Sequence, residues 1–64
     1  NPLAAILTAA LMLEQLGFPR EAERVEAAVR RSIALGQTTP DLGGELGTEA
    51  VGDWICNELL RQAG

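Results

Sequence analysis

NPLAAILTAALML, residues 1–13, carries the strongest structural signal in this chain. Asn1 can cap a helix through its side-chain oxygen, and Pro2 suits the first helical position, where a backbone N–H is not needed. No charged residue follows until Glu14. The apolar side chains wrap most of the way round, and a helix that is apolar on all sides must be buried on all sides. We therefore expect a helix over residues 2–16 that the other residues of this chain do not cover alone.

Two more helices are indicated by end signals and by apolar spacing. Gly17 suits the left-handed position that ends many helices, and Pro19 suits the first position of a helix over residues 19–35. A last helix is expected over residues 48–61, with Thr48 as its N-cap. Apolar residues at helical spacing are predicted to face inward. They are Ala22, Val25, Val29, Ile33, Val51, Trp54, Ile55 and Leu59.

A turn-rich connection is predicted between the second and third of these helices, over residues 36–47. Residues 37–47 contain three glycines and one proline, which is typical of a loop. The run GGELG at residues 43–47 fits neither of the glycine-rich phosphate-binding motifs, and no buried strand is indicated before it, so we interpret it as a flexible connection. The predicted fold class is mainly α, with three helices and a Gly/Pro-rich loop before the last.

Composition and charge limit the classes of protein that fit. A chain of 64 residues forms at most one domain, and a hydrophobic fraction of 47% excludes a disordered segment. The net charge of −4 argues against binding to nucleic acid or to an anionic membrane surface. No run reaches the roughly 20 apolar residues that span a bilayer. We therefore expect no nucleic acid and no membrane among the partners of this chain.

Cysteine and histidine usage bears on metal sites and on location. Cys56 is the only cysteine and there is no histidine, so an internal disulfide is impossible and a structural zinc site is excluded. Because no histidine can activate the thiol, we interpret Cys56 as a small core residue, and Gly52 before it as a point where another backbone approaches closely. A lone thiol is typical of a reducing compartment, so the predicted location is cytoplasmic.

Acidic residues cluster near the loop, but no catalytic pair is assigned. Glu45, Glu49 and Asp53 are spaced by four residues and would share one face of a continuous helix. Glycines interrupt that helix, so these side chains and Asp41 are interpreted as solvated charges or caps rather than as a general acid and base. From the residues alone we assign no catalytic residue and no metal ligand.

The order of short motifs along the chain is more specific than any one motif. Asn-Pro stands at residues 1–2, and an apolar run follows at residues 6–13. A helix rich in Glu, Ala and Arg ends at Gly36, and the runs TPDLGG at residues 39–44 and GTEAVGD at residues 47–53 come last. This order resembles the C-terminal end of the isopropylmalate/isocitrate dehydrogenase family, which are metal-dependent dehydrogenases that decarboxylate 2-hydroxy acids.

The resemblance implies a cofactor site at two residues of this chain. Asn1 matches the Asn of the family's Asn-Pro motif, which lies against the adenine of the cofactor. Asp41 matches the Asp of the Thr-x-Asp motif, on the adenosine side of the same pocket. Members that prefer NADP tend to carry a Tyr just before that Asp and an Arg three residues after it, whereas Pro40 and Gly44 stand there in this chain. The resemblance therefore implies NAD, with Mg²⁺ or Mn²⁺ in the full-length family.

The resemblance also implies that the reaction needs residues from outside this segment. The family's substrate-binding arginines, its catalytic Tyr and Lys and the Asp ligands of its metal lie upstream, and this chain has no Lys, Tyr or His. We therefore expect the isolated chain to be inactive and to hold no cofactor. The run TPDLGG resembles tartrate/malate and homoisocitrate members more closely than isopropylmalate members.

Two functions follow from these observations. The first is the C-terminal segment of an NAD-dependent decarboxylating dehydrogenase, part of a large α/β domain, where it packs beside the sheet and supplies the adenosine side of the NAD pocket. The second is a free-standing helical interaction module, derived from such an enzyme, that buries its first helix by self-association. The expected partner is the remainder of a dehydrogenase polypeptide in the first case and a second copy in the other. We expect a homo-oligomer.

Overall fold

The computed structural model describes residues 2–63. Three α-helices and one short 3-10 helix follow one another, namely α1 (Pro2–Gln15), α2 (Pro19–Ala34), η1 (Pro40–Leu42) and α3 (Thr48–Ala63). No strand occurs within residues 2–63, and the predicted mainly α fold is confirmed. Each α-helix begins and ends within two residues of its expected bounds.

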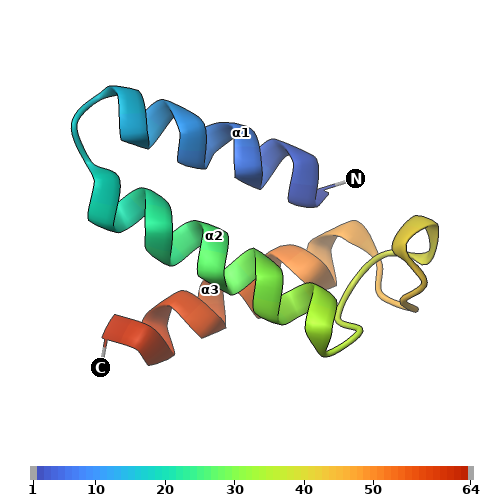
Figure 1. Cartoon of the computed structure of the whole chain (residues 1–64). Coiled ribbons are helices and arrows are strands. Elements are labelled where there is room, and N and C mark those ends of the chain that lie inside the picture. The colour runs from blue at the N-terminus through green and yellow to red at the C-terminus, as the bar shows by residue number, and fades with distance from the viewer. Residues whose placement is uncertain (1, 64) are drawn as a thin grey trace.

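A tight turn folds α1 back on α2 as an antiparallel hairpin, and α3 packs against α2 (Figure 1). Gly17 sets this turn, because its φ of 91° is a left-handed conformation that residues with a Cβ rarely adopt. The N–H of Phe18 donates to the carbonyl of Leu13 (2.9 Å), and the N–H of Gly17 donates to the carbonyl of Glu14 (3.2 Å). This pair of bonds is a Schellman ending, which satisfies two carbonyls that the end of a helix leaves open.

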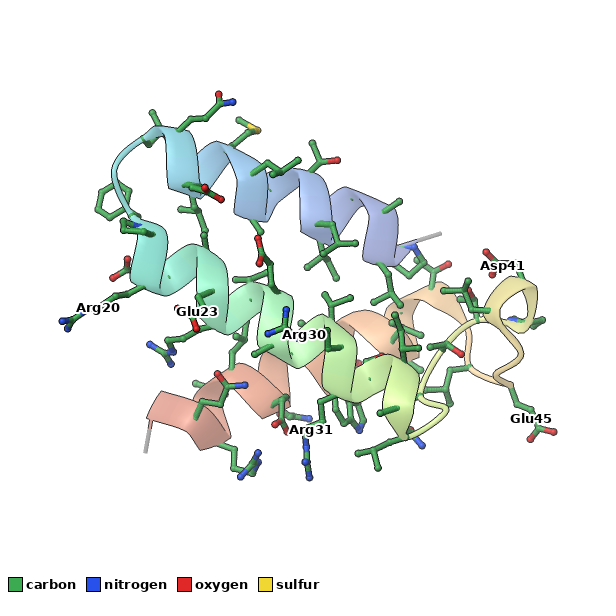
Figure 2. All side chains as sticks on the ribbon, viewed as in Figure 1. Arg20, Glu23, Arg30, Arg31, Asp41 and Glu45 are labelled. Carbon is green, nitrogen blue, oxygen red and sulfur yellow. The ribbon has the colours of Figure 1, made fainter. Side chains whose placement is uncertain are left out.

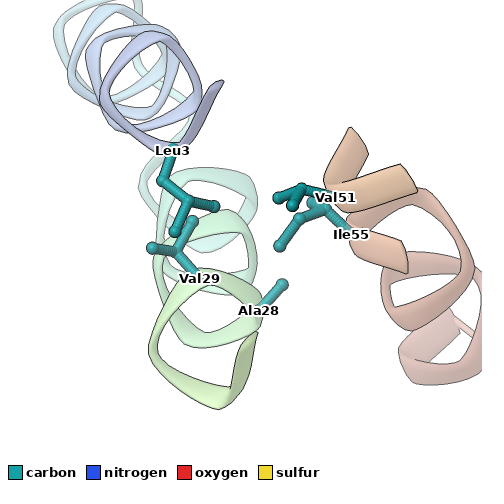
Figure 3. Close-up of a cluster of buried hydrophobic side chains, with 5 residues drawn as sticks. All are labelled: Leu3, Ala28, Val29, Val51 and Ile55. Carbon is teal, nitrogen blue, oxygen red and sulfur yellow. The ribbon is translucent and has the colours of Figure 1, made fainter. Parts of the chain in front are cut away.

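The hydrophobic core lies where the three α-helices meet (Figure 3). Its buried side chains come from all three of them: Leu3, Ala28, Val29, Val51 and Ile55. Partly buried side chains pack around this cluster, namely Ile6, Leu46, Trp54 and Leu59. Full burial of a Val, Leu or Ile side chain stabilises the fold by about 1.5–3 kcal/mol. The cluster therefore fixes the first half of α3 against α1 and α2, and with it the loop that leads into α3.

The inward face of α2 differs from the prediction at one position. Ile33 is 51% exposed, so its predicted burial is wrong, whereas the other predicted residues of α2 are buried or half-buried. Ser32 takes the inward position, and its hydroxyl donates to the carbonyl of Gln37 at 2.6 Å. A buried hydroxyl is tolerated here because it is hydrogen-bonded. The next residue along α2 is turned by about 100° and faces away from the core.

The predicted inward residues of α3 are buried or half-buried, but three finer predictions are wrong. Cys56 is exposed rather than part of the core, because it lies one step past the inward stripe of α3. Apart from its chain neighbours and the backbone of its own helix, a Cβ at Gly52 would have no described atom within 4 Å, so the expected close approach of another backbone does not occur in this part of the chain. The N-cap position belongs to Gly47 rather than to Thr48, since the carbonyl of Gly47 accepts the first intrahelical hydrogen bond (3.1 Å).

Much of α1 is left uncovered by the other helices. Leu3 and Ala10 are its buried residues. Large apolar side chains elsewhere on the helix and just after it are exposed, and we call them the outer surface of α1: Leu7, Leu11, Met12 and Leu16. The expected burial on all sides is therefore not met within the described chain. None of the helices in residues 2–63 is long and apolar enough to cross a membrane.

Candidate functional site

The fold brings the loop that holds Asp41 and the start of α1 to one end of the molecule. In Figure 1, η1 and the loop around it (yellow) lie at the same end as the start of α1 (blue). Asp41 is the middle residue of η1 and is exposed. In the view of Figure 2, Asp41 projects from the side of the loop nearer the start of α1, and Glu45 projects from the other side. Asn1 lies outside the described residues.

Backbone hydrogen bonds close the loop into a turn around η1, so residues 43–46 are part of a hydrogen-bonded turn rather than the flexible connection that was expected. The carbonyl of Thr39 accepts bonds from the N–H groups of Leu42 (3.0 Å) and Gly44 (3.2 Å). The carbonyl of Thr38 accepts a bond from the N–H of Leu46 (3.0 Å), where the loop returns toward α3. These bonds lie on both sides of η1, so the loop itself sets the position of the residue at its centre.

Gly44 is required by the close return of this loop. A Cβ at position 44 would overlap the backbone carbonyl of Thr38, which is itself held by its bond to Leu46. Glycine avoids the overlap because it has no Cβ. In this conformation of the loop, no larger residue fits at position 44.

Two neighbouring threonines lie beneath the turn, and their hydroxyl groups differ in hydrogen bonding. Thr38 is 2% exposed and Thr39 is 8% exposed. The hydroxyl of Thr39 donates a hydrogen bond to Oδ1 of Asp41. Oγ1 of Thr38 has no hydrogen-bond partner in the part of the chain that the structure describes. The exposed carboxylate of Asp41 is therefore tied to a buried side chain by a charge-assisted bond, which is stronger than a neutral one.

A second charged group joins α2 to α3 and was not predicted from the sequence. The side chain of Glu58 is 7% exposed, and its Oε1 lies 3.1 Å from Nε of Arg31 and 2.5 Å from a terminal guanidinium nitrogen of Arg61. The hydrogen bond from Arg61, together with the charges of both arginines, holds the pKa of Glu58 below its ordinary value of 4.5. Glu58 follows the buried Ile55 by three residues, and this helical spacing is the signal that could have found it.

The remaining acidic candidates do not converge on one site. Glu45 belongs to the loop, whereas Glu49 and Asp53 belong to α3. All three are exposed, as expected for solvated charges. Among residues 2–63, no group of three or more His, Cys, Asp or Glu side chains is placed so that it could hold a metal ion.

Comparisons with known proteins bear on the whole segment. A family model described as isocitrate/isopropylmalate dehydrogenase matches residues 1–55. The chain is 56% identical over 62 residues to a 3-isopropylmalate/3-methylmalate dehydrogenase of Methanocaldococcus jannaschii, and this match covers 97% of the chain and 19% of that protein. It is 54% identical over 59 residues to a 3-isopropylmalate dehydrogenase of Archaeoglobus fulgidus, and 49% identical over 59 residues to an isocitrate/homoisocitrate dehydrogenase of Thermus thermophilus. Each of these two matches covers 92% of the chain and 18% of the relative.

The matches also show how large a part of its relatives the chain corresponds to. The chain spans less than a fifth of the length of these relatives, and no solved structure matches it. The family model covers both Asn1 and the loop that holds Asp41. The relatives include isopropylmalate and isocitrate/homoisocitrate dehydrogenases, so the substrate stays a prediction. The predicted family is confirmed, and the chain belongs to the isocitrate/isopropylmalate dehydrogenase family.

Proposed function

We propose that this chain is the C-terminal segment of an NAD-dependent dehydrogenase that oxidatively decarboxylates a 2-hydroxy acid of the isopropylmalate, homoisocitrate or tartrate type. In that enzyme the segment packs within the large domain and supplies the adenosine side of the NAD pocket through Asn1 and Asp41. The observation that carries the proposal is the closed turn that holds the exposed Asp41, at the end of the molecule where α1 begins. Membership of the family, and the small share of each relative that the chain covers, support the rest.

The lack of basic residues in the loop and the lack of room for a side chain at position 44 both support a preference for NAD over NADP. The 2′-phosphate of NADP is bound best by Arg or Lys, and residues 36–47 contain neither. By the family resemblance, position 44 is where NADP-preferring members tend to carry Arg, and the turn leaves no room for a side chain there. The carboxylate of Asp41 would also repel a second anion beside it. These features favour the 2′-hydroxyl of NAD.

The chemical steps are assigned to the remainder of the polypeptide. In such an enzyme, NAD would supply the acceptor for the hydride, and Mg²⁺ or Mn²⁺ would supply the positive charge that polarises the substrate. This chain has no Lys, Tyr or His, and its described side chains form no metal-binding group. No proton transfer and no metal ligand is therefore given to this segment, which binds and orients adenosine and completes the packing of the domain. The isolated chain is accordingly proposed to be inactive.

The outer surface of α1 supports the packing role. Contiguous exposed apolar side chains of this kind mark a surface that another part of a protein covers, and Leu11 alone is 57% exposed. The proposed cover is the remainder of the polypeptide, because more than four-fifths of the length of the relatives lies outside the matched segment. In the cytoplasmic, homo-oligomeric enzyme that we propose, this surface belongs to the interior.

Substitution of Asp41 in the native polypeptide tests the cofactor role. We expect Asp41→Ala to raise the KM for NAD about tenfold, because the pocket loses a charged hydrogen-bonding group. The kcat should change little, since the adenosine end lies away from the reacting atoms. Glu45→Ala is the matched control, because Glu45 is an exposed acidic residue on the other side of the same loop (Figure 2). Steady-state kinetics with varied NAD checks the pair, and an unchanged KM in Asp41→Ala would remove Asp41 from the pocket.

The exposure of the outer surface of α1 also keeps the free-standing module as a second candidate. A module would bury this surface against a second copy of the chain. It should then show a cooperative thermal transition and a defined oligomer as a polypeptide of 64 residues. A dehydrogenase segment, taken alone, should be loosely packed or aggregate, and should bind NAD no better than a nonspecific control.

A further inference from the structure

We propose that Thr39 is a positioning residue for the cofactor, because its hydroxyl holds the carboxylate of Asp41 in the orientation that adenosine recognition needs. This inference rests on the proposed function and extends it to a residue that itself lies below the surface. Thr39 is 8% exposed, so it acts on the ligand through Asp41 rather than by contact.

The backbone of Thr39 is held at its carbonyl and at the peptide bond that follows it. Its carbonyl accepts two hydrogen bonds, from Leu42 and from Gly44, and the proline after it fixes the first φ of η1. The burial of its side chain restricts its rotamers. The hydroxyl is therefore a fixed donor, and it donates to Oδ1 of Asp41.

An exposed aspartate normally samples several rotamers, and a ligand that selects one of them must offset the lost entropy. The bond from Thr39 removes part of this cost before the ligand arrives, because one carboxylate oxygen is already held. The expected consequence is tighter binding at the adenosine end of NAD, with no direct effect on the reacting end.

The neighbouring threonine supplies a matched control within the same turn. Thr38 is 2% exposed, and its Oγ1 has no hydrogen-bond partner in residues 2–63. Replacing Thr38 by Val keeps the shape of the side chain and removes a buried hydroxyl that no described atom satisfies, so it should be neutral or stabilising. The same replacement at Thr39 removes the donor to Asp41 and leaves the shape unchanged.

The test measures the affinity of ADP-ribose, which is NAD without its nicotinamide ring, by isothermal titration calorimetry of the native polypeptide. Thr39→Val should raise the Kd about threefold to tenfold, the scale of the free energy needed to order one side chain on binding. Thr39→Ser should restore the wild-type Kd, because it keeps the hydroxyl, and Thr38→Val should leave the Kd unchanged. In steady-state kinetics, Thr39→Val should raise the KM for NAD and leave kcat nearly unchanged.

A double-substitution cycle separates positioning from general loosening of the loop. In the background of Asp41→Ala, a further Thr39→Val should not weaken ADP-ribose binding any more, because the group that it positions is gone. Additive losses would overturn the inference, as would a Thr39→Ser variant as weak as Thr39→Val. If Thr39→Val does not give a folded protein, Thr39→Ser and Thr39→Ala form a second pair that differs only by the hydroxyl.

The two proposals fail in different ways. A raised Kd in Asp41→Ala together with an unchanged Kd in Thr39→Val would overturn the role of Thr39 and leave the cofactor site in place. An unchanged Kd in Asp41→Ala would remove the cofactor site, and the role of Thr39 with it.

Discussion

The carboxylate of Glu58 is held on the buried side of α3 by two arginines from different helices. A buried charge that loses its partner is strongly destabilising, because it stays desolvated without compensation. Arg31 comes from α2 and Arg61 from α3, so the ionised form of Glu58 links the two helices. We infer that this group fixes how α3 sits along α2.

The pairing of Glu58 makes the stability of the protein depend on pH in acid. Folding lowers the pKa of Glu58 from 4.5, so its contribution to stability is fully present above pH 4.5 and is lost as the pH falls through the lower folded value. The difference in Tm between the wild-type protein and Glu58→Gln should therefore be largest near neutral pH and shrink in acid. Thermal unfolding of both proteins over about pH 3 to 7 measures this difference in Tm. Asp53→Asn, which changes an exposed carboxylate of the same helix, is the control, and a constant Tm difference for Glu58→Gln would contradict the pairing.

Single residues show which features of the structure could be predicted from the sequence and which could not. Asp41 could be singled out from the order of the motifs, but its bond to Thr39 depends on the three-dimensional path of the turn. Ile33 and Ser32 show the same limit. Helical spacing predicts that inward residues recur every three or four positions, but it does not decide which of two adjacent residues faces inward. The packing of α2 against α1 and α3 sets which of the two faces inward, and this packing is a tertiary feature.

At the scale of elements, the ends of the helices could be predicted because their signals are local. Pro2 and Pro19 stand at the first helical positions, and Gly17 and Gly36 take the positive φ values that follow α1 and α2. The short helix η1 was not predicted, since three residues are too few for a periodic pattern. Its closed turn depends on the lack of a Cβ at Gly44, a requirement that appears only when the loop returns on itself.

Packing of α3 on the hairpin is the element-scale contact that orders the loop. Val51 is fully buried in the core cluster, so Val51→Ala should destabilise the protein by about 2 kcal/mol through lost burial and a residual cavity. Asn57→Ala, at an exposed position of the same helix, should stay within about 0.5 kcal/mol. Chemical denaturation of both variants checks the difference. Equal stability of the two would mean that α3 does not pack as described.

At the scale of the whole molecule, the outer surface of α1 distinguishes a segment of a longer polypeptide from a free-standing protein. In the first case the rest of the polypeptide covers this surface, and in a free-standing monomer it faces water. Leu11 is 57% exposed in this chain. If the remainder of the polypeptide covers it, Leu11→Glu buries a charge and should cost several kcal/mol, about 3 or more, in the native protein. Asn57→Glu places the same charge on an exposed polar position of α3 and should be tolerated. Thermal unfolding compares the two, and a neutral Leu11→Glu would mean that the outer surface of α1 faces water.

The size of the native polypeptide tests the central claim most directly. An antibody raised against the charged surface of α2, which includes Arg20 and Arg31 (Figure 2), detects the product in its source after separation by mass. We predict a polypeptide several times longer than 64 residues, because the chain covers less than a fifth of each relative described here. A native product of about 64 residues would contradict the dehydrogenase segment, and the question would become what covers the outer surface of α1.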